Sequence, residues 1–415
     1  SNTAAENNSE KESCQNNHES CQFWAEQGEC DQNPSYMHQN CMLACDKCNE
    51  FIEITDEASA KFGETQVIRG QQAEADRMKA LLDDMMLYME NEVYMEDEYD
   101  AVREECLNRD KLCIFWASIG ECENNPGYMT IQCSPACRTC RNIDVDYRCK
   151  YDPAQYPNAY ESGDLHAMFE RIANGAFDDL KPAVHSAPLD YHEKKQRTNS
   201  SSTIDETNLK LLGPWIVTFD NFVTDEEADK LIQYGFDRGY ERSKDVGERK
   251  FDGTFDGLTN SGRTSHNAWC ENDCDADPIT QSIMSRIERV TNIPYPNSEY
   301  LQILKYEVGE FYNQHHDFIE YQSERMCGPR VLTFFLYLSD VEEGGGTKFN
   351  RLGIEVQPKK GRALLWPSVL DEDPENMRDS RTFHEAMPVV RGQKFAANAW
   401  LHLRDFKEAN DKGCA

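Results

Sequence analysis

The stretch YLQILKYEVGEFYNQHHDFIEY, residues 300–321, decides the fold of the C-terminal half of the chain. Its opening residues and the later run RVLTFFLYLSD (330–340) are rich in β-branched and aromatic residues, which is typical of β-sheet. Because alternate side chains of a strand share a face, we expect His315 and Asp317 on one face and His316 on the other. With a second imidazole, this pair would form a 2-His-1-carboxylate site of the kind that holds non-haem Fe(II). A surface His-His-Asp patch is the alternative that the tripeptide alone leaves open.

Further elements are expected on both sides of this stretch. Many short strands with Gly-rich turns indicate a barrel or sandwich, and we expect them at 300–308, 311–318, 330–338, 354–357, 362–366, 381–390 and 394–403. The run TDEEADKLIQYGFDRG predicts a helix that begins after the N-cap Thr224 and closes at Gly239, and DPITQSIMSRIERVTNI predicts another. The charged segment ERSKDVGERKFDGTFDGLTNSGRTS (241–265) is expected to be a mobile loop near a site.

The second imidazole and a candidate anion anchor come from the last expected strands. His384 starts a strand 67 residues after Asp317, so this strand can return it beside the first pair. Lys394 opens the next strand and is a single cation in the apolar pattern KFAANAWLHL. A buried lysine needs an anion, and a diacid cosubstrate would provide one.

Length, charge and cysteine content limit the class of protein. A chain of 415 residues is long enough for two or three domains, and a net charge of −32 disfavours nucleic acid and acidic membrane surfaces as partners. The longest apolar run, VLTFFLYL, is shorter than the ~20 residues of a membrane span. The opening SNTAAENNSE lacks Met and a signal peptide, so we expect a processed or trimmed ectodomain, with a lost signal or anchor left open. The 17 cysteines favour an oxidising compartment, and Asn7 and Asn199 lie in glycosylation sequons.

Twelve of the cysteines form an internal repeat. Two modules, residues 14–48 and 106–140, have the same six cysteine positions and matching residues between them, as in CQFWAEQGEC and CIFWASIGEC. Modules this small cannot bury a sufficient core without disulfides. The spacing alone leaves 15 pairings open in each module. Zinc is a weaker alternative, because no matching histidines complete a four-ligand site.

The repeated pattern resembles the ShK toxin-like (ShKT) domain. The resemblance implies first-to-sixth, second-to-fourth and third-to-fifth bridges, which are Cys14–Cys48, Cys21–Cys41, Cys30–Cys45, Cys106–Cys140, Cys113–Cys133 and Cys122–Cys137. The run CENDC offers a further local pair, Cys270–Cys274. Cys149, Cys327 and Cys414 remain, so at least one cysteine is expected to be free or intermolecular.

The C-terminal segments LQILKYEVGEFYNQHHD, GPRVLTFFLYLSDVEEGGGTKF and HEAMPVVRGQKFAANAWLHLRDF resemble the procollagen and plant/algal prolyl 4-hydroxylases. These belong to the 2-oxoglutarate, Fe(II)-dependent dioxygenase superfamily. The resemblance implies an α+β multidomain chain with a C-terminal double-stranded β-helix (jelly roll) and flanking helices. It implies that His315, Asp317 and His384 bind Fe(II), and that Lys394 binds 2-oxoglutarate. Tyr306 and Thr347 are implied to assist Lys394.

The same resemblance implies a peptide site and an activity. The residues matching the peptide site are Tyr312, Arg330, Trp400, His402 and Arg263. The implied reaction is 4-hydroxylation of peptidyl proline with 2-oxoglutarate and O2, giving 4-hydroxyproline, succinate and CO2, with L-ascorbate rescuing oxidised iron. Met387 departs from the collagen-type pattern, which has Cys there, so a family disulfide is absent at that position. We expect a proline-containing peptide or protein as substrate and the lumen of the endoplasmic reticulum or Golgi as location.

The expected domain order follows from these patterns. It is an ShKT domain at 14–48, an acidic helical linker at 49–105, a second ShKT domain at 106–140, a helical and loop connector at 141–211, and the dioxygenase domain at 212–407. In the linker, a helical stripe expected to be a packing face consists of Leu81, Leu82, Met85, Met89 and Val93. In the connector, GDLHAMFERIA predicts a helix and HEKKQRTNSSSTIDETN an exposed loop. The ShKT modules are expected to contact substrate or another protein.

Two other functions stay open at this point. The same core could act on another residue or on a small molecule, or the chain could be a catalytically silent ShKT binding protein. Intact metal and cosubstrate residues speak against the silent protein, because drift has no reason to spare four dispersed polar side chains. Succinate production with and without a proline-rich peptide discriminates between these functions.

Overall fold

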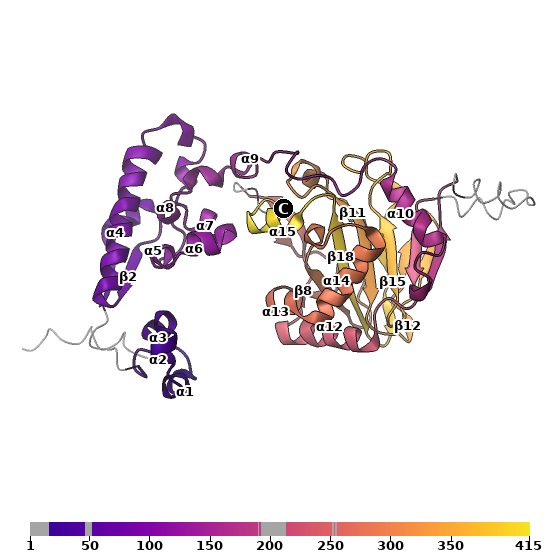
Figure 1. Cartoon of the computed structure of the whole chain (residues 1–415), viewed down its shortest axis with the longest axis horizontal. Coiled ribbons are helices and arrows are strands. Elements are labelled where there is room, and N and C mark those ends of the chain that lie inside the picture. The colour runs from indigo at the N-terminus through magenta and orange to yellow at the C-terminus, as the bar shows by residue number, and fades with distance from the viewer. Residues whose placement is uncertain (1–15, 46–51, 190, 192–212, 251–252, 254) are drawn as a thin grey trace, which may run out of the picture. The chain divides into compact units, whose positions relative to one another are not determined.

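The computed structural model describes residues 16–45, 52–189, 191, 213–250, 253 and 255–415 (Figure 1). The chain divides into two compact units, one made mainly of residues 1–148 and the other mainly of residues 149–415. Within the described residues, no helix is both long and apolar enough to cross a membrane.

The two cysteine-rich modules fold alike, as short helices held by disulfides. The first contains α1 (Cys21–Glu26), α2 (Glu29–Gln32) and α3 (Pro34–Asn40), and the second contains α5 (Cys113–Ser118), α6 (Glu121–Asn124), α7 (Pro126–Gln132) and α8 (Ser134–Cys137). Their bridges are Cys21–Cys41, Cys30–Cys45, Cys106–Cys140, Cys113–Cys133 and Cys122–Cys137, the pairs that the ShKT resemblance implies. The expected Cys14–Cys48 bridge lies outside the described residues.

The interval expected to be a helical linker is a folded part of the second module. It contains a hairpin of β1 (Ile52–Asp56) and β2 (Gln66–Gly70), which the sequence analysis missed, followed by α4 (Gln72–Tyr88). The stripe on α4 and the turn after it lies in a core shared with module cysteines, and the stripe residues in that core are Leu82, Met85, Met89 and Val93, with Leu81 at its margin. The packing face is therefore used within this unit, where it covers the small module.

The second unit is a jelly roll of antiparallel strands. Its large sheet has the order β3 (Pro182–Ser186), β4 (Ile216–Phe219), β15 (Ala363–Pro367), β11 (Arg330–Tyr337), β18 (Lys394–His402), β9 (Leu301–Tyr306), β8 (His266–Cys270), β5 (Glu241–Arg242). The small sheet has the order β10 (Tyr312–His315), β16 (His384–Ala386), β13 (Thr347–Phe349), β14 (Ile354–Val356). Two further pairs are β6 (Asp245–Arg249) with β7 (Phe255–Leu258), and β12 (Glu343–Gly344) with β17 (Val389–Arg391).

Strand alternation gives the large sheet two different faces. On β18, Phe395, Ala397 and Ala399 join the core beneath the helices. Ala396 on the same strand joins the second core, which contains residues of both sheets. Because side chains alternate, Lys394 also faces the small sheet, and it lies opposite Tyr306 in the register of β18 and β9. The sheet therefore directs this lysine into the interior of the jelly roll.

Helices cover the outer face of the large sheet, namely α10 (Asp164–Ala173), α12 (Asp225–Arg238) and α14 (Pro278–Thr291) (Figure 1). The predicted start and end of α12 are confirmed. Thr224 accepts a hydrogen bond from the Glu227 backbone, and the Glu227 side chain accepts one from the Thr224 backbone in a capping box. Gly239 then ends the helix with a positive φ of 80°, a conformation that glycine adopts without steric cost.

The interval expected to be a connector is largely built into the second unit. Its helix α10 lies in the main core, and its strand β3 pairs with β4 at the edge of the large sheet. A disulfide between Cys149 and Cys414, which the sequence could not assign, joins the start of this unit to the segment after α15 (Phe406–Asp411). The polar run predicted as an exposed loop lies outside the described residues. The remaining short helices are α9 (Val145–Arg148) and α13 (Asn272–Ala276).

Two strand expectations need correction. The strand expected at 381–390 is two strands, β16 and β17, separated by Met387 and Pro388, because proline cannot donate a ladder hydrogen bond. The segment expected to be a loop at 241–265 contains β5 and the hairpin of β6 and β7. Its charged residues concealed the strand pattern, since no residue of β6 or β7 with a described side chain is fully buried.

Candidate active site

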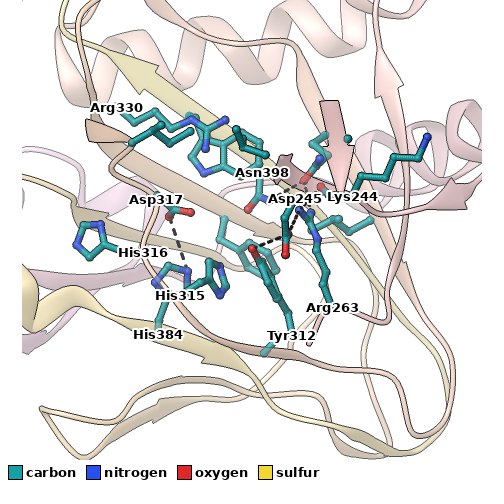
Figure 2. Close-up of a pocket in the computed structure, with 18 of the residues that line it drawn as sticks. Lys244, Asp245, Arg263, Tyr312, His315, His316, Asp317, Arg330, His384 and Asn398 are labelled. Carbon is teal, nitrogen blue, oxygen red and sulfur yellow. Dashed lines mark hydrogen bonds and ion pairs between the residues drawn. The ribbon is translucent and has the colours of Figure 1, made fainter. Parts of the chain in front are cut away.

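Three side chains meet at the inner face of the small sheet. His315 at the end of β10 lies directly opposite His384 at the start of β16. Asp317 follows two residues after β10 ends, and its Oδ2 lies 3.7 Å from Nε2 of His384 (Figure 2). One ligand atom from each of the three lies within 4.8 Å of the others. The structure thus brings together the three residues that the sequence analysis selected.

Both imidazoles are oriented by backbone carbonyls. Nδ1 of His315 lies 2.8 Å from the carbonyl oxygen of Asn313, and Nδ1 of His384 lies 3.0 Å from that of Thr382. A carbonyl oxygen can only accept, so each Nδ1 carries the proton and donates it. Each Nε2 is then left with its lone pair. This arrangement, in which a carbonyl fixes the tautomer of a histidine, is the one that metal-binding histidines use.

The carboxylate of Asp317 is buried and ionised. Thr333 on β11 donates a hydrogen bond from its hydroxyl to Oδ2 of Asp317 at 2.7 Å. Burial raises the pKa of Asp317, but His384, His315 and the Thr333 hydroxyl more than offset it and lower the pKa to about 2. Burial and the neighbouring His384 hold the pKa of His315 well below its ordinary value. At neutral pH the site therefore offers a carboxylate and a neutral imidazole.

His316 is directed away from this group, as the strand argument predicts. Its Nε2 lies 3.0 Å from the carbonyl oxygen of Asp379 and therefore donates, while its Nδ1 accepts from the backbone N–H of Phe318 at 2.9 Å. Both ring nitrogens are thus engaged with the surrounding backbone. His316 fastens the segment after β10 and is not part of the three-residue group.

Lys394 is fully buried and lacks an anion among the described residues. Its Nζ has no hydrogen-bond partner there and lies 5.0 Å from the ring centres of Tyr306 and Phe335 and 5.5 Å from that of Tyr337. Burial lowers the pKa of Lys394 to about 7. An unpaired buried ammonium is costly, so this position fits a ligand that brings a carboxylate. Thr347, which accepts a hydrogen bond from the Tyr337 hydroxyl at 2.7 Å, lies beside this ring of aromatic residues.

A cavity of about 440 Å³ lies next to the His315, Asp317 and His384 group. Its lining includes the three-residue group and the predicted residues Tyr306, Thr347, Tyr312, Arg263, Arg330 and Trp400. Lys394 lies behind this wall, screened by Tyr306 and Phe335. Figure 2 shows Arg330 and Asn398 on one side of the cavity and Arg263 and Tyr312 on another. The cavity is therefore lined by His315, Asp317 and His384 and by other polar side chains.

The structure places His402 elsewhere than the resemblance implies. His402 is fully buried and does not line the cavity. Its Nε2 lies 2.8 Å from Oε1 of Glu299, and Glu299 also binds Arg330, whose Nη2 lies 3.0 Å from Oε2. The Arg330 guanidinium lies 3.8 Å from the ring centre of Trp400. Within the described part of the chain, His402 therefore connects to the cavity through Glu299 and Arg330.

Several cavity residues were missed by the sequence analysis. Gln302 on β9 and Asn398 on β18 lie opposite each other, and the Asn398 amide donates to Oε1 of Gln302 at 3.2 Å. A signal for both was present, because each is a polar residue at an inward position of an otherwise apolar strand, as Lys394 is. Glu299, which binds the cavity residue Arg330 without lining the cavity itself, carried no such signal, since it precedes the strand and its partners come from distant segments.

The donor set fits the metal and the cosubstrate that this class of fold uses. Two imidazoles and one carboxylate at one cavity are the donor set with which non-haem Fe(II) oxygenases hold their metal, and these three residues would hold Fe(II) here. The unpaired Lys394 ammonium fits one carboxylate of a diacid. The jelly roll and this site together define a 2-oxoglutarate, Fe(II)-dependent oxygenase.

Comparison with known proteins agrees with this class. Residues 301–402 match the 2OG-Fe(II) oxygenase superfamily, and residues 13–48 and 105–140 each match the ShK domain-like family. Probable prolyl 4-hydroxylase 8 of Arabidopsis thaliana is 32% identical over 213 residues, which cover 46% of this chain and 70% of the relative. Prolyl 4-hydroxylase subunit alpha-2 of Caenorhabditis elegans is 34% identical over 266 residues, which cover 62% of this chain and 45% of that subunit. The chain belongs to the prolyl 4-hydroxylase family.

A solved structure is also similar. It is the viral collagen prolyl hydroxylase of Paramecium Bursaria Chlorella virus-1 in its 2OG complex, with 25% sequence identity and a TM-score of 0.36. The match covers 45% of this chain and 95% of the viral chain.

The disulfides of the modules and of the second unit indicate an oxidising compartment, the lumen of the secretory pathway.

Proposed function

We propose that this protein hydroxylates C4 of proline residues in peptides, consuming 2-oxoglutarate and O2 and releasing succinate and CO2. The observation that carries the proposal is the pairing of a His315, Asp317 and His384 group with a buried, unpartnered Lys394 in one jelly roll. Membership of the prolyl 4-hydroxylase family supports proline as the residue that is modified.

His315, Asp317 and His384 would hold Fe(II) through two imidazole nitrogens and one carboxylate oxygen. The carbonyl oxygens of Asn313 and Thr382 fix the tautomers of the two histidines, so each imidazole presents Nε2 without rearrangement. The Thr333 hydroxyl donates a hydrogen bond to Oδ2 of Asp317 and so fixes the orientation of this carboxylate. When bound, Fe(II) with 2-oxoglutarate and O2 supplies the oxidising chemistry that an unactivated C–H bond requires.

Lys394 would bind the distal carboxylate of 2-oxoglutarate. A charge-assisted hydrogen bond in a wall of Tyr306, Phe335 and Tyr337 is protected from water, so it is stronger than the same contact at the surface. Tyr306 and Thr347 line the cavity between Lys394 and the iron group, where their hydroxyls can hydrogen-bond the cosubstrate.

The peptide would lie across the open side of the cavity. Arg330 is held over Trp400 by Glu299, and together they offer a flat cationic and aromatic surface. Nε1 of Trp400 is buried without a hydrogen-bond partner among the described residues, so it can donate to a peptide carbonyl. Tyr312 and Arg263 form the wall on another side.

Location and accessory partners extend the proposal. We infer that the protein works in the endoplasmic reticulum or Golgi lumen, where disulfides persist and secreted substrates pass. L-ascorbate would restore iron oxidised in turnovers without peptide. The ShKT modules would contact the substrate protein or another protein.

The test is a peptide-dependent turnover assay. Purified protein with Fe(II), ascorbate and 2-oxoglutarate is incubated with proline-rich peptides, succinate is measured, and mass spectrometry locates the added oxygen. We expect succinate release that requires peptide and a 16 Da gain on proline, the mass of one oxygen atom. His315→Ala should be inactive and His316→Ala should retain most activity, because only His315 belongs to the iron group. Oxygen found on another residue, or activity in His315→Ala and not in His316→Ala, would contradict the assignment.

A further inference from the structure

One carboxylate joins three separate segments at a wall of the cavity. Asp245 lies on β6 of the hairpin, and its Oδ1 accepts a hydrogen bond from the Tyr312 hydroxyl at 3.0 Å and lies 3.3 Å from Nη1 of Arg263. Its Oδ2 accepts from the side-chain amide of Asn260. Tyr312 belongs to β10, and Arg263 lies just before β8, so Asp245 connects both sheets with the hairpin (Figure 2).

The groups that Asp245 binds form a stack ending on a proposed iron ligand. The Arg263 guanidinium lies 4.6 Å from the ring centre of Tyr312. The Tyr312 ring in turn stacks on the His315 imidazole, with ring centres 3.6 Å apart and planes inclined by 20°. The face of the cavity next to the iron group is therefore an aromatic ring whose orientation is set from the hairpin.

Both partners depend on the Asp245 carboxylate. Arg263 is buried, and its other acceptors, the carbonyl oxygen of Lys244 and the amide oxygen of Gln302, are neutral. Burial raises the pKa of Tyr312, so its hydroxyl stays protonated and donates. Removing the carboxylate would leave a buried guanidinium without its counter-charge and a phenol without its acceptor, and both would shift to find new partners.

Asp245 is separate from the cosubstrate anchor. The rings around Lys394 belong to Tyr306, Phe335 and Tyr337, and none of these forms a hydrogen bond or ion pair with Asp245 in the described part of the chain. The contacts of Asp245 lie instead on the wall formed by Tyr312 and Arg263. A substitution of Asp245 should consequently affect the binding of a ligand that contacts Tyr312 and Arg263.

We propose that Asp245 is a positioning residue for the peptide, holding Tyr312 and Arg263 so that the wall next to the iron group fits the proline ring and its backbone. The proposal rests on the proposed function. It predicts that Asp245 governs the KM for peptide and leaves the KM for 2-oxoglutarate unchanged. It also predicts coupling between Asp245 and Tyr312, because they act as one unit.

The test compares Asp245→Ala, Asp245→Asn, Tyr312→Phe and the double variant Asp245→Ala/Tyr312→Phe. The control is Glu248→Gln, an exposed carboxylate on the same strand that does not line the cavity. Asp245→Ala should raise the peptide KM about tenfold or more, since a hydrogen-bonded charge pair is lost. Asp245→Asn keeps an acceptor for Tyr312 and should lie between Asp245→Ala and wild type. The double variant should be less impaired than the product of the two single effects.

Two readouts separate positioning from general damage. The KM for 2-oxoglutarate and the thermal midpoint should stay close to wild type in Asp245→Asn. An equal rise in both KM values, or a peptide KM in Asp245→Ala that matches Glu248→Gln, would overturn the proposal. Calorimetric titration of the Fe(II)-loaded protein with a proline-rich peptide measures the affinity for peptide without turnover. If the wild-type protein binds the peptide but does not hydroxylate it, the proposed function is wrong and the role of Asp245 in peptide binding is not affected. Affinity unchanged in Asp245→Ala would count against the role of Asp245.

Discussion

Two largely buried cations lie in the same jelly roll, and they differ in whether the protein supplies their anion. Arg330 forms an ion pair with Glu299, which also binds His402. Lys394 has aromatic rings around its ammonium and no hydrogen-bond partner among the described residues. Both lie on the central strands β11 and β18, so the difference does not come from their place in the sheet.

The difference separates a structural charge from a binding charge. Burial alone would raise the pKa of Glu299, but Arg330 and His402 lower it to about 2. Burial likewise opposes protonation of His402, yet the Cys327 sulfur and Glu299 raise its pKa to about 9. The charge of Arg330 is therefore paired with a carboxylate within the fold. Burial without compensation lowers the pKa of Lys394 to about 7, so this residue gains most from an added anion.

The largest expected effect is on cosubstrate binding. Lys394→Ala removes one side of the buried charge pair with 2-oxoglutarate, and breaking such a pair typically costs about 3–5 kcal/mol. The KM for 2-oxoglutarate should rise roughly 10²–10³-fold or more. Fe(II) binding, measured by metal titration, should persist because Lys394 is not a ligand.

The matched variants of Lys394 test the anchor further. Lys394→Arg should recover only part of the affinity, since a planar guanidinium does not place its charge where an ammonium does. The same measurement on Arg330→Lys should leave the KM for 2-oxoglutarate near wild type, because Arg330 already has its anion. Normal 2-oxoglutarate binding in Lys394→Ala would show that the carboxylate anchor lies elsewhere.

The sequence predicted those site residues that stand out within the pattern of their own strand. His315, Asp317 and Lys394 follow from alternation and from polar residues in apolar strands. The structure places His315 and Asp317 in the lining of the cavity and Lys394 behind its wall, next to Tyr306. Even there the reason was incomplete, because β10 ends at His315 and the Thr333 hydroxyl of another strand orients Asp317. The helices α12 and α14 were predictable because their caps are local.

Pairings between distant segments were not predictable in the same way. Glu299, Arg330 and His402 come from three segments, and nothing in their local sequence reports that they meet. The pairing of His402 with Glu299 was therefore not anticipated, and its place at the peptide site came from the family resemblance alone. The hairpin of β1 and β2 was missed because its alternation is short and acidic, and it is held by the second ShKT module rather than by its own pattern.

The second prediction concerns the stability that Glu299 provides by pairing with Arg330 and His402. Glu299→Gln leaves Arg330 and His402 buried without a carboxylate, so the free energy of unfolding should fall by about 3–5 kcal/mol. Denaturant titration measures the change. Glu342→Gln, which breaks an exposed pair with Arg391, is the control and should cost less than about 1 kcal/mol. Equal effects of the two substitutions would mean that the Arg330 group is not a buried, mutually dependent unit.

The third prediction is a pH dependence that only the unpaired cation should show. Free Lys394 has a pKa of about 7, and a bound carboxylate favours its protonated form. Affinity for 2-oxoglutarate should therefore fall as pH rises above 7, by up to about tenfold per unit while one proton is taken up on binding. Titration calorimetry across about pH 6–9, in buffers of equal ionic strength, measures the change in 2-oxoglutarate affinity with pH. Lys394→Arg stays charged throughout and should lose the dependence; an identical slope in that variant would assign it to another group.

The smallest expected effect is a gain in stability. Lys394→Met keeps an unbranched chain among Tyr306, Phe335 and Tyr337 and removes the unpaired charge, so the thermal midpoint of the cosubstrate-free protein should rise by a few degrees. The folded pKa of about 7 lies below the ordinary value of 10.5, so wild-type stability rises with pH between these values as the folded lysine loses its proton first. The gain from Lys394→Met should accordingly be largest at pH 7 and below and should shrink as pH approaches 10.5. Arg330→Met should instead lower the midpoint, because it removes one of the two cationic partners of the buried Glu299 carboxylate. A loss of stability in both variants would remove the distinction between the two cations.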